Sequence, residues 1–148
     1  MTPKEFIAKV KDPIKKEAAA HGIKCPGAVI AQAALESGWG SSGLTVKANN
    51  LFGIKAGKSW TGEKYTVKTK EFINGRMRTV TADFRKYKTW AASIKDYFKL
   101  MDVKRYANLK GVTSVKTYSE LLKKDGYATD PAYPGKIQSI YNKYVKGA

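Results

Sequence analysis

The stretch PGAVIAQAALESGWG, residues 26–40, decides how this chain folds. Pro26 suits the first position of a helix, and Gln32 is the only polar residue between it and Leu35. A helix that is apolar nearly all round is normally buried. We therefore expect this stretch to form a buried helix that ends at Gly38.

Glu36 continues an apolar stripe of that helix, because it follows Val29 by seven positions and Ala33 by three. Burial disfavours the charged form of a carboxyl group, and the negative end of the helix dipole acts in the same direction, so both raise its pKa. A glutamate that is still protonated near neutral pH is suited to general acid catalysis. The alternative is a glutamate on the last helical turn that points into solvent.

The composition indicates a folded and strongly basic protein. The chain has 148 residues, of which 43% are hydrophobic, and its formal net charge is +16. This length fits one domain with a hydrophobic core, and the simplest expectation is a monomer. No stretch approaches the roughly 20 apolar residues of a membrane span, and the first residues lack the apolar region of a signal peptide.

One cysteine, Cys25, and one histidine, His21, limit the chemistry. An internal disulfide and a cysteine-rich metal site are excluded, and most catalytic triads and zinc sites need more of these residues. We expect His21 to cap a helix end rather than to act as a base. Carboxylate chemistry without a metal or cofactor is what remains.

The positive charge predicts a polyanionic partner. Nucleic acid is one candidate, because tyrosine and phenylalanine rings among basic residues can stack on bases. The basic residues are scattered, however, with no arginine-rich block, zinc-finger pattern or RNA-binding aromatic motif, which argues against specific nucleic-acid binding. Bacterial wall polymers are also anionic, and a cationic protein that binds them loses affinity as the salt concentration rises.

Helical patterns occupy both ends of the chain. Thr2 and Glu5 have the form of a capping box, so a helix is expected to begin there and to end at Gly22. The pair Asp12-Pro13 resembles a second helix start and predicts a break or kink inside this stretch. One short helix is expected at about residues 41–47, and helical spacing is found in three later segments, at about residues 91–101, 115–122 and 137–144.

Between residues 64 and 87 the pattern changes to alternation. Polar and apolar side chains alternate on both sides of Asn74-Gly75, a dipeptide typical of two-residue hairpin turns. We therefore expect an α+β fold, in which a small antiparallel β-hairpin lobe over about residues 60–87 is inserted in a mainly helical domain. The hairpin and the helices should flank a cleft with Glu36 at its floor.

Glu71 is the first candidate for a second carboxylate, because it shares the predicted inner strand face with Val67 and Thr69. A glycosidase pairs an acid that protonates the leaving oxygen with a group that activates water or stabilises the oxocarbenium-like state. The alternative is an exposed strand residue that pairs with Lys68 or Lys70. Because sequence gives no distance between the carboxyl groups, inversion and retention of the anomeric centre both remain open.

A sugar-binding cleft also needs flat aromatic faces and amide groups. Aromatic residues beside glycines or turns tend to line grooves, although each can equally be an ordinary core or lid residue. Asparagines in such places can equally be turn formers. The candidates are Trp39, Phe52, Trp60, Tyr127, Asn49 and Asn50.

Five motifs, in this order along nearly the whole chain, resemble glycoside hydrolase family 73, which contains bacterial and phage endo-β-N-acetylglucosaminidases. The motifs are AQAALESGWG at 31–40, NLFGIK at 50–55, TKEF at 69–72, FRKY at 84–87 and GYATDPAY at 126–133. Phe72 stands where many members have tyrosine. The resemblance implies that residues 1–148 form a single catalytic domain of lysozyme-like fold.

The same resemblance implies cleavage of the peptidoglycan glycan strand on the reducing side of N-acetylglucosamine. A substrate-assisted route through the 2-acetamido group remains open beside a direct role of the second carboxylate. The residues to which it assigns roles are Glu36 as general acid, Glu71 as second carboxylate, Tyr127 near the catalytic centre, and Asn50 and Phe52 in the cleft.

Two other functions remain open on the sequence alone. A muramidase of the same fold would cleave after N-acetylmuramic acid instead, and an inert cationic module would only bind the wall or another polyanion. In each case we expect action on the bacterial cell wall, either as a phage lysin or as the catalytic part of a secreted autolysin. Peptidoglycan and other anionic wall polymers are the expected partners.

Overall fold

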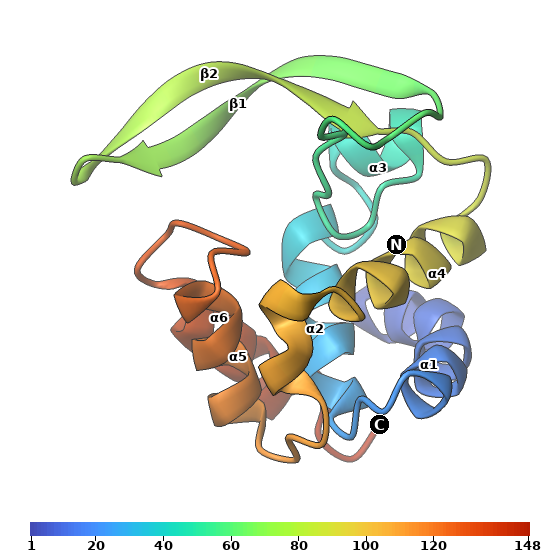
Figure 1. Ribbon diagram of the computed structural model, residues 1–148. Helices are drawn as coiled ribbons and strands as arrows, with labels where there is room; N and C mark the ends of the chain where they lie inside the picture. Colours follow the sequence, from blue (N-terminus) through green and yellow to red (C-terminus); the bar gives the residue numbers. More distant parts are fainter.

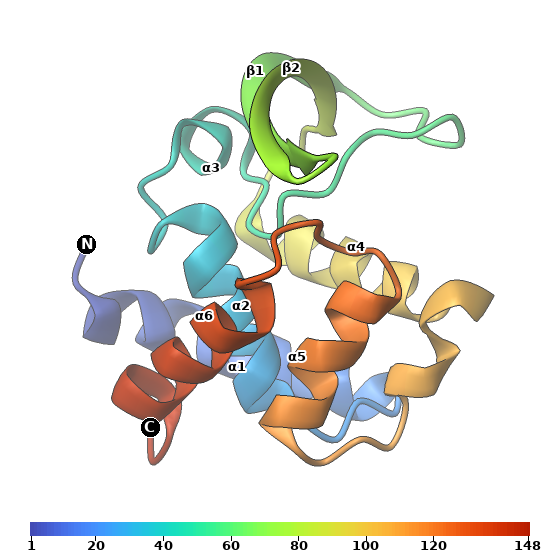
Figure 2. The same ribbon diagram turned by 90° about the vertical axis from the view of Figure 1, so that its left-hand side faces the viewer.

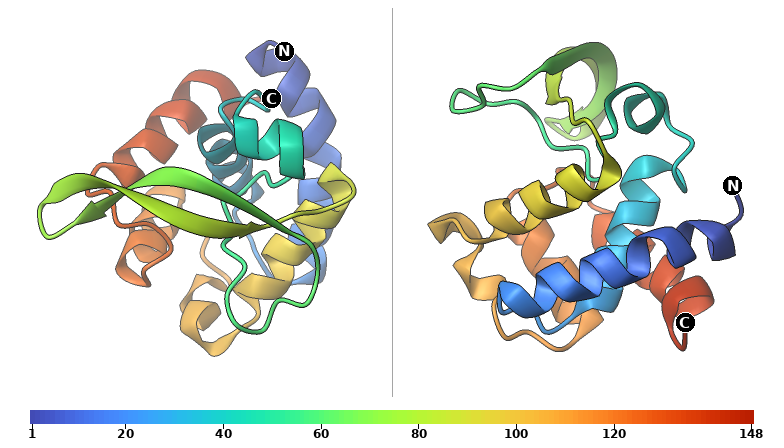
Figure 3. Two further views of the ribbon diagram at one scale, coloured as in Figure 1. Left: turned by 90° about the horizontal axis from the view of Figure 1, so that it is seen from above. Right: turned by 90° about the vertical axis from the view of Figure 1, so that its right-hand side faces the viewer.

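A long β-hairpin arches over a body of α-helices (Figure 1). The computed structural model describes the whole sequence, residues 1–148. The elements in chain order are α1 (Pro3–Ala20), α2 (Pro26–Ser37), α3 (Gly43–Ala48), β1 (Lys64–Ile73), β2 (Arg76–Arg85), α4 (Trp90–Met101), a 3₁₀-helix (Lys104–Leu109), α5 (Val115–Lys124), α6 (Tyr133–Ile140) and a π-helical turn (Tyr141–Val145). Seen from above, the hairpin crosses the body from α3 toward α6 (Figure 3). None of these helices is both long and apolar enough to span a membrane.

The hairpin is regular over its whole length. β1 pairs with β2 in one continuous antiparallel register. Asn74 and Gly75 have φ angles of 50° and 82°, the left-handed values that a two-residue hairpin turn requires. Every second residue of β1 from Tyr65 to Glu71 is half-buried, and the residues between them are exposed. The predicted hairpin and the inner strand face that includes Glu71 are therefore confirmed.

α2 lies in the middle of the helical body and contacts α1, α5 and α6. All residues from Ala28 to Ala34 are buried, including the polar side chain of Gln32. Gly38 follows the helix with a left-handed φ of 55°, and its N–H donates to the carbonyl oxygens of Ala34 and Leu35. The predicted buried helix and its terminal glycine are confirmed.

α1 runs unbroken through Pro13, so the predicted break was wrong. Pro13 has no N–H to donate to the Lys9 carbonyl, and its ring crowds that carbonyl. The helix continues because its apolar stripe is buried on both sides of the proline, so packing outweighs the local penalty. The stripe consists of Phe6, Val10, Ile14 and Ala18.

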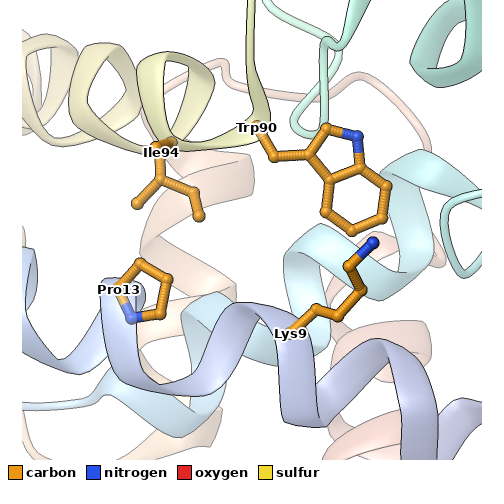
Figure 4. Close-up of a pocket in the computed structure, with 5 residues that line it drawn as sticks. Lys9, Pro13, Trp90 and Ile94 are labelled. Atoms are coloured by element: carbon orange, nitrogen blue, oxygen red, sulfur yellow. The ribbon is translucent and has the colours of Figure 1, made fainter.

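A cavity of about 250 Å³ lies beside Pro13, between α1 and α4 (Figure 4). The Lys9 ammonium points at the face of Trp90, 4.9 Å from the ring centre, and Ile94 lies across from Pro13 (Figure 4). No residue of this cavity lines the cleft described below. The cavity therefore belongs to the packing of the two helices.

The only histidine lies where two helices end. The His21 N–H donates to the carbonyl oxygens of Glu17 and Ala18 at the end of α1. Its ring Nδ1 lies 2.7 Å from Oδ2 of Asp102, the residue that ends α4. The predicted capping role of His21 is confirmed.

Asn50 joins the base of the hairpin to the helices. Its side-chain nitrogen donates to the carbonyl oxygens of Ile54 and Arg85, both at 2.9 Å, and its side-chain oxygen accepts from the Ile54 N–H at 3.1 Å. Arg85 in turn donates from Nη1 to the Asp96 carboxylate on α4, at 2.8 Å. Asn50 is fully buried, so these bonds fix the loop after α3 against the end of β2.

Replacing Asn50 with alanine should lower the free energy of unfolding by about 2–4 kcal/mol. The substitution leaves the buried Ile54 N–H and the Arg85 carbonyl oxygen without their side-chain partner, which costs about 1–3 kcal/mol for each group. Urea denaturation followed by circular dichroism measures the change. Asn142→Ala removes an exposed amide and is the matched control, with an expected change within about 0.5 kcal/mol. Equal losses in both variants would contradict the anchoring role.

Candidate active site

A cleft of about 730 Å³ lies between the hairpin and the helical body. The helical side of its lining comes from the last turn of α2, α3, the end of α4, the 3₁₀-helix and α6. The loop at residues 53–55, both strands, and the loop between α5 and α6 complete it. This last loop lies beneath the hairpin in two perpendicular views (Figures 1 and 2). Glu36 and Glu71, the two acids predicted from the sequence, both line this cleft.

Glu36 is half-buried on the last turn of α2. Its Oε2 accepts a hydrogen bond of 2.8 Å from the Tyr133 hydroxyl. Gly53 faces its other oxygen so closely that an added Cβ would lie 3.3 Å from Oε1, and the φ of 66° at Gly53 also favours glycine. The structure thus gives the carboxyl group a fixed place at the cleft floor.

The pKa of Glu36 is raised to about 7. Burial is the main cause, because it disfavours the charged carboxylate. The hydrogen bond from Tyr133 lowers the pKa, and the negative charge of Glu71 raises it again. A carboxyl group with this pKa is in part protonated at neutral pH, as a general acid must be.

A chain of buried hydrogen bonds supports Tyr133 from behind. The Gln32 side-chain nitrogen donates to the Tyr133 hydroxyl at 3.0 Å, so the tyrosine's own hydrogen is directed to Glu36. The Gln32 side-chain oxygen accepts from the Tyr97 hydroxyl at 2.6 Å. The Tyr97 hydroxyl also lies 2.7 Å from that of Tyr118. Gln32, the only polar residue of α2 before Leu35, therefore fixes which way Tyr133 donates.

Glu71 lies on the inner face of β1, opposite the helices. Its carboxylate pairs with the Lys55 ammonium on the loop before the hairpin, not with Lys68 or Lys70. The side chain is 23% exposed, which leaves room for contact from the cleft. Its charge acts on the pKa of Glu36, so the two carboxyl groups share one electrostatic environment.

Tyr127 forms part of the same wall as Tyr133. Their rings are stacked with centroids 6.4 Å apart, and Tyr127 also lies 6.1 Å from the ring of Tyr106. The Tyr127 hydroxyl donates to the carbonyl oxygen of Phe52 at 2.7 Å. Burial, followed by the charge of Glu36, raises the pKa of this hydroxyl well above its usual value. Tyr127 therefore presents its ring to the cleft and uses its hydroxyl to hold the Phe52 loop.

Two tryptophans that we expected to bind substrate do not line the cleft. Trp39 has a left-handed φ of 58°, and this turn carries its ring onto Phe6 and Tyr144, with centroids 5.8 and 5.0 Å away. Trp60 packs edge-on against Tyr87 at 5.6 Å, and its Nε1 donates within its own loop. Both rings contribute to packing rather than to the cleft wall.

Phe52 and the two asparagines also have structural positions. Phe52 is fully buried and stacks on Tyr97 with centroids 4.1 Å apart. Asn50 uses its amide in the hydrogen bonds at the hairpin base. Asn49 ends α3 with a left-handed φ of 54°, as its alternative role of turn former requires. None of the three lines the cleft.

Sequence reasoning missed Tyr133 and Gln32. Tyr133 stands in the quoted GYATDPAY motif, but only folding brings the start of α6 to the end of α2. Gln32 stood out in the sequence as the single polar residue between Pro26 and Leu35. Because a buried polar side chain needs a hydrogen-bond partner, this position was the one signal in the sequence for a buried hydrogen-bond network.

Comparisons with known proteins agree with this architecture. Residues 11–146 match the model of the Glucosaminidase family, described as mannosyl-glycoprotein endo-beta-N-acetylglucosaminidase. The chain is 41% identical over 125 residues to the exo-glucosaminidase LytG of Bacillus subtilis, which covers 80% of this chain and 44% of that protein. It is 36% identical over 147 residues to the peptidoglycan hydrolase FlgJ of Vibrio parahaemolyticus, which covers 96% of this chain and 47% of that one. The chain thus spans just under half the length of these relatives.

Solved structures give the same result. A mutant peptidoglycan hydrolase from Sphingomonas sp. A1 superposes with a TM-score of 0.84 and 34% identity, over 93% of this chain and 92% of that one. The truncated glycoside hydrolase domain of Salmonella typhimurium FlgJ has a TM-score of 0.76 and 31% identity, over 99% and 100% of the two chains. The predicted lysozyme-like α+β fold is therefore confirmed, and the chain belongs to the Glucosaminidase family of glycoside hydrolases.

Proposed function

We propose that this protein hydrolyses peptidoglycan at the β-1,4 bond that follows N-acetylglucosamine, with Glu36 as the general acid. The observation that carries the proposal is the Glu36 carboxyl group, with a pKa of about 7, held by Tyr133 in a cleft that also contains Glu71. The Glucosaminidase family membership and the peptidoglycan hydrolases among its relatives support the choice of bond and polymer.

In the proposed reaction, protonated Glu36 gives its proton to the glycosidic oxygen while the bond from that oxygen to the anomeric carbon breaks. The positive charge that develops on the sugar is stabilised from the other face by the Glu71 carboxylate or by the 2-acetamido group of the sugar. A water molecule then adds to the anomeric carbon and its proton returns to Glu36. Tyr133 keeps the Glu36 carboxyl oriented throughout.

The expected setting is the bacterial cell wall, where the protein acts as a monomer. Its charge of +16 favours binding to peptidoglycan and to other anionic wall polymers, and this binding should weaken as salt rises. A phage lysin and the catalytic part of a secreted autolysin both fit this setting. We propose no specific nucleic-acid partner, cofactor or metal.

A muramidase of the same fold is the second candidate, and the exact bond distinguishes the two. Borohydride reduction of the released fragments labels the new reducing end, and mass spectrometry identifies it. Reduced glucosamine supports our proposal, whereas reduced muramic acid supports the muramidase. An inert wall-binding module would sediment with the wall in a salt-sensitive way and release no reducing ends.

Replacing Glu36 with glutamine should abolish clearing of a bacterial wall suspension, with a loss of at least about a hundredfold. Glutamine keeps the size and polarity of the side chain but has no proton to give. Glu120→Gln, an exposed glutamate on α5, is the matched control and should clear the wall at the normal rate. Near-normal clearing by the Glu36 variant would overturn its assignment as the acid.

Replacing Glu71 with glutamine should reduce the rate less than the Glu36 change does, because the acetamido group can stabilise the same charge. The rate of reducing-end release at saturating wall concentration measures this effect. If activity is unchanged, Glu71 only pairs with Lys55 and has no part in the reaction.

Replacing Tyr133 with phenylalanine should move the alkaline limb of the pH profile to higher pH. Activity needs protonated Glu36, so it falls as the pH rises through a pKa of about 7. The Tyr133 hydrogen bond lowers that pKa, and its removal therefore raises the pKa. Tyr144→Phe, at an exposed tyrosine, is the control that should leave the limb in place. A shift of the Tyr133 variant to lower pH is the result that this assignment forbids.

A further inference from the structure

The cleft is lined by more positive than negative side chains, and most of the positive ones form ion pairs with carboxylates of the protein itself. Five basic residues line it: Lys55, Lys70, Arg85, Arg105 and Lys136. Three of these form ion pairs, Lys55 with Glu71, Arg85 with Asp96 and Lys136 with Asp130. Lys70 and Arg105 form none.

Arg105 differs from Lys70 because the protein holds its charged group in place. Its Nε donates to the Asp125 carbonyl oxygen at 2.6 Å, and its Nη2 donates to the Gly126 carbonyl oxygen at 3.1 Å. Its guanidinium lies 5.5 Å from the centre of the neighbouring Tyr106 ring. Lys70, on the exposed side of β1, makes no side-chain hydrogen bond within the protein.

The backbone is shaped around this guanidinium. Gly126 has a left-handed φ of 86°, and a Cβ added there would lie 2.3 Å from Nη2 of Arg105. A side chain at this position would therefore displace the guanidinium. An arginine has five N–H donors, and the two carbonyl contacts use two of them. The remaining donors form a planar fork, which suits the two oxygens of a carboxylate.

A row of aromatic rings extends along the cleft wall from Glu36 to Arg105. Tyr133 holds Glu36, Tyr127 stacks on Tyr133, and Tyr106 lies 6.1 Å from Tyr127. Arg105 is the next residue along this wall, so it lies in the cleft but away from the bond that Glu36 would cleave. A group that binds there belongs to a neighbouring part of the polymer.

We propose that Arg105 forms a subsite for a carboxylate carried by the glycan strand beside the cleaved bond. This inference rests on the proposed function. N-acetylglucosamine is neutral, whereas the muramic acid residues of peptidoglycan bear a lactyl group that ends in a carboxylate or in a peptide that carries carboxylates. The subsite would therefore distinguish peptidoglycan from neutral polymers of N-acetylglucosamine.

The experiment compares two forms of one purified peptidoglycan from which phosphate-containing wall polymers have been removed. One form keeps its carboxylates, and in the other they are coupled to methylamine and become neutral. Neutralisation should raise the KM of the unmodified protein about tenfold and leave kcat within about twofold. Arg105→Gln should have the raised KM on both forms. Arg76→Gln, at the exposed hairpin tip outside the cleft, should behave like the unmodified protein.

Several outcomes would overturn the subsite. One is that Arg105→Gln, with a normal melting temperature, remains as sensitive to neutralisation as the unmodified protein. Another is that the effect of Arg105→Gln occurs only on walls that retain their phosphate polymers, because the recognised anion is then a phosphate. If the unmodified protein cleaves neither form, the proposed function has failed, and calorimetric binding of the two uncleaved forms still tests Arg105.

Discussion

A carboxyl group placed on the last turn of a buried helix is the constraint on which the rest of this structure depends. α2 is surrounded by other helices, so Glu36 leaves the core only where the helix ends at Gly38. Burial at that point raises the Glu36 pKa, and the Tyr133 hydrogen bond prevents a larger rise. Because Gln32 and Tyr97 support Tyr133 from within the core, the orientation of the acid is tied to packing.

The second side of the cleft depends on how the hairpin is attached. Asn50 and the Arg85–Asp96 pair join the base of the hairpin to the loop after α3 and to α4. Beyond this base the strands extend over the helical body, with Glu71 on their inner face. The position of β1 above α2, and with it the position of Glu71 relative to Glu36, therefore depends on these contacts at the hairpin base as well as on the Lys55 and Tyr133 contacts to the acids themselves.

Regular patterns made the fold predictable, whereas the site depended on contacts between distant segments. The periodicity of α2 and the Asn74-Gly75 turn have local causes, so both predictions are confirmed. The predicted break at Pro13 was wrong because buried packing outweighed a local helix-breaking signal. Trp39 was expected to line the cleft, but its left-handed backbone turns the ring away from it. Tyr133 was missed because its partner is 97 residues away in the sequence.

The most direct test of the account is the pKa of Glu36 itself. Carbon NMR of protein labelled at the glutamate side-chain carboxyl carbons, titrated with pH, reports it, and the Glu36→Gln variant identifies the resonance. The account predicts a midpoint near pH 7. A midpoint at the ordinary glutamate value near 4.5 would contradict it, because such a carboxyl has almost no proton to give at neutral pH.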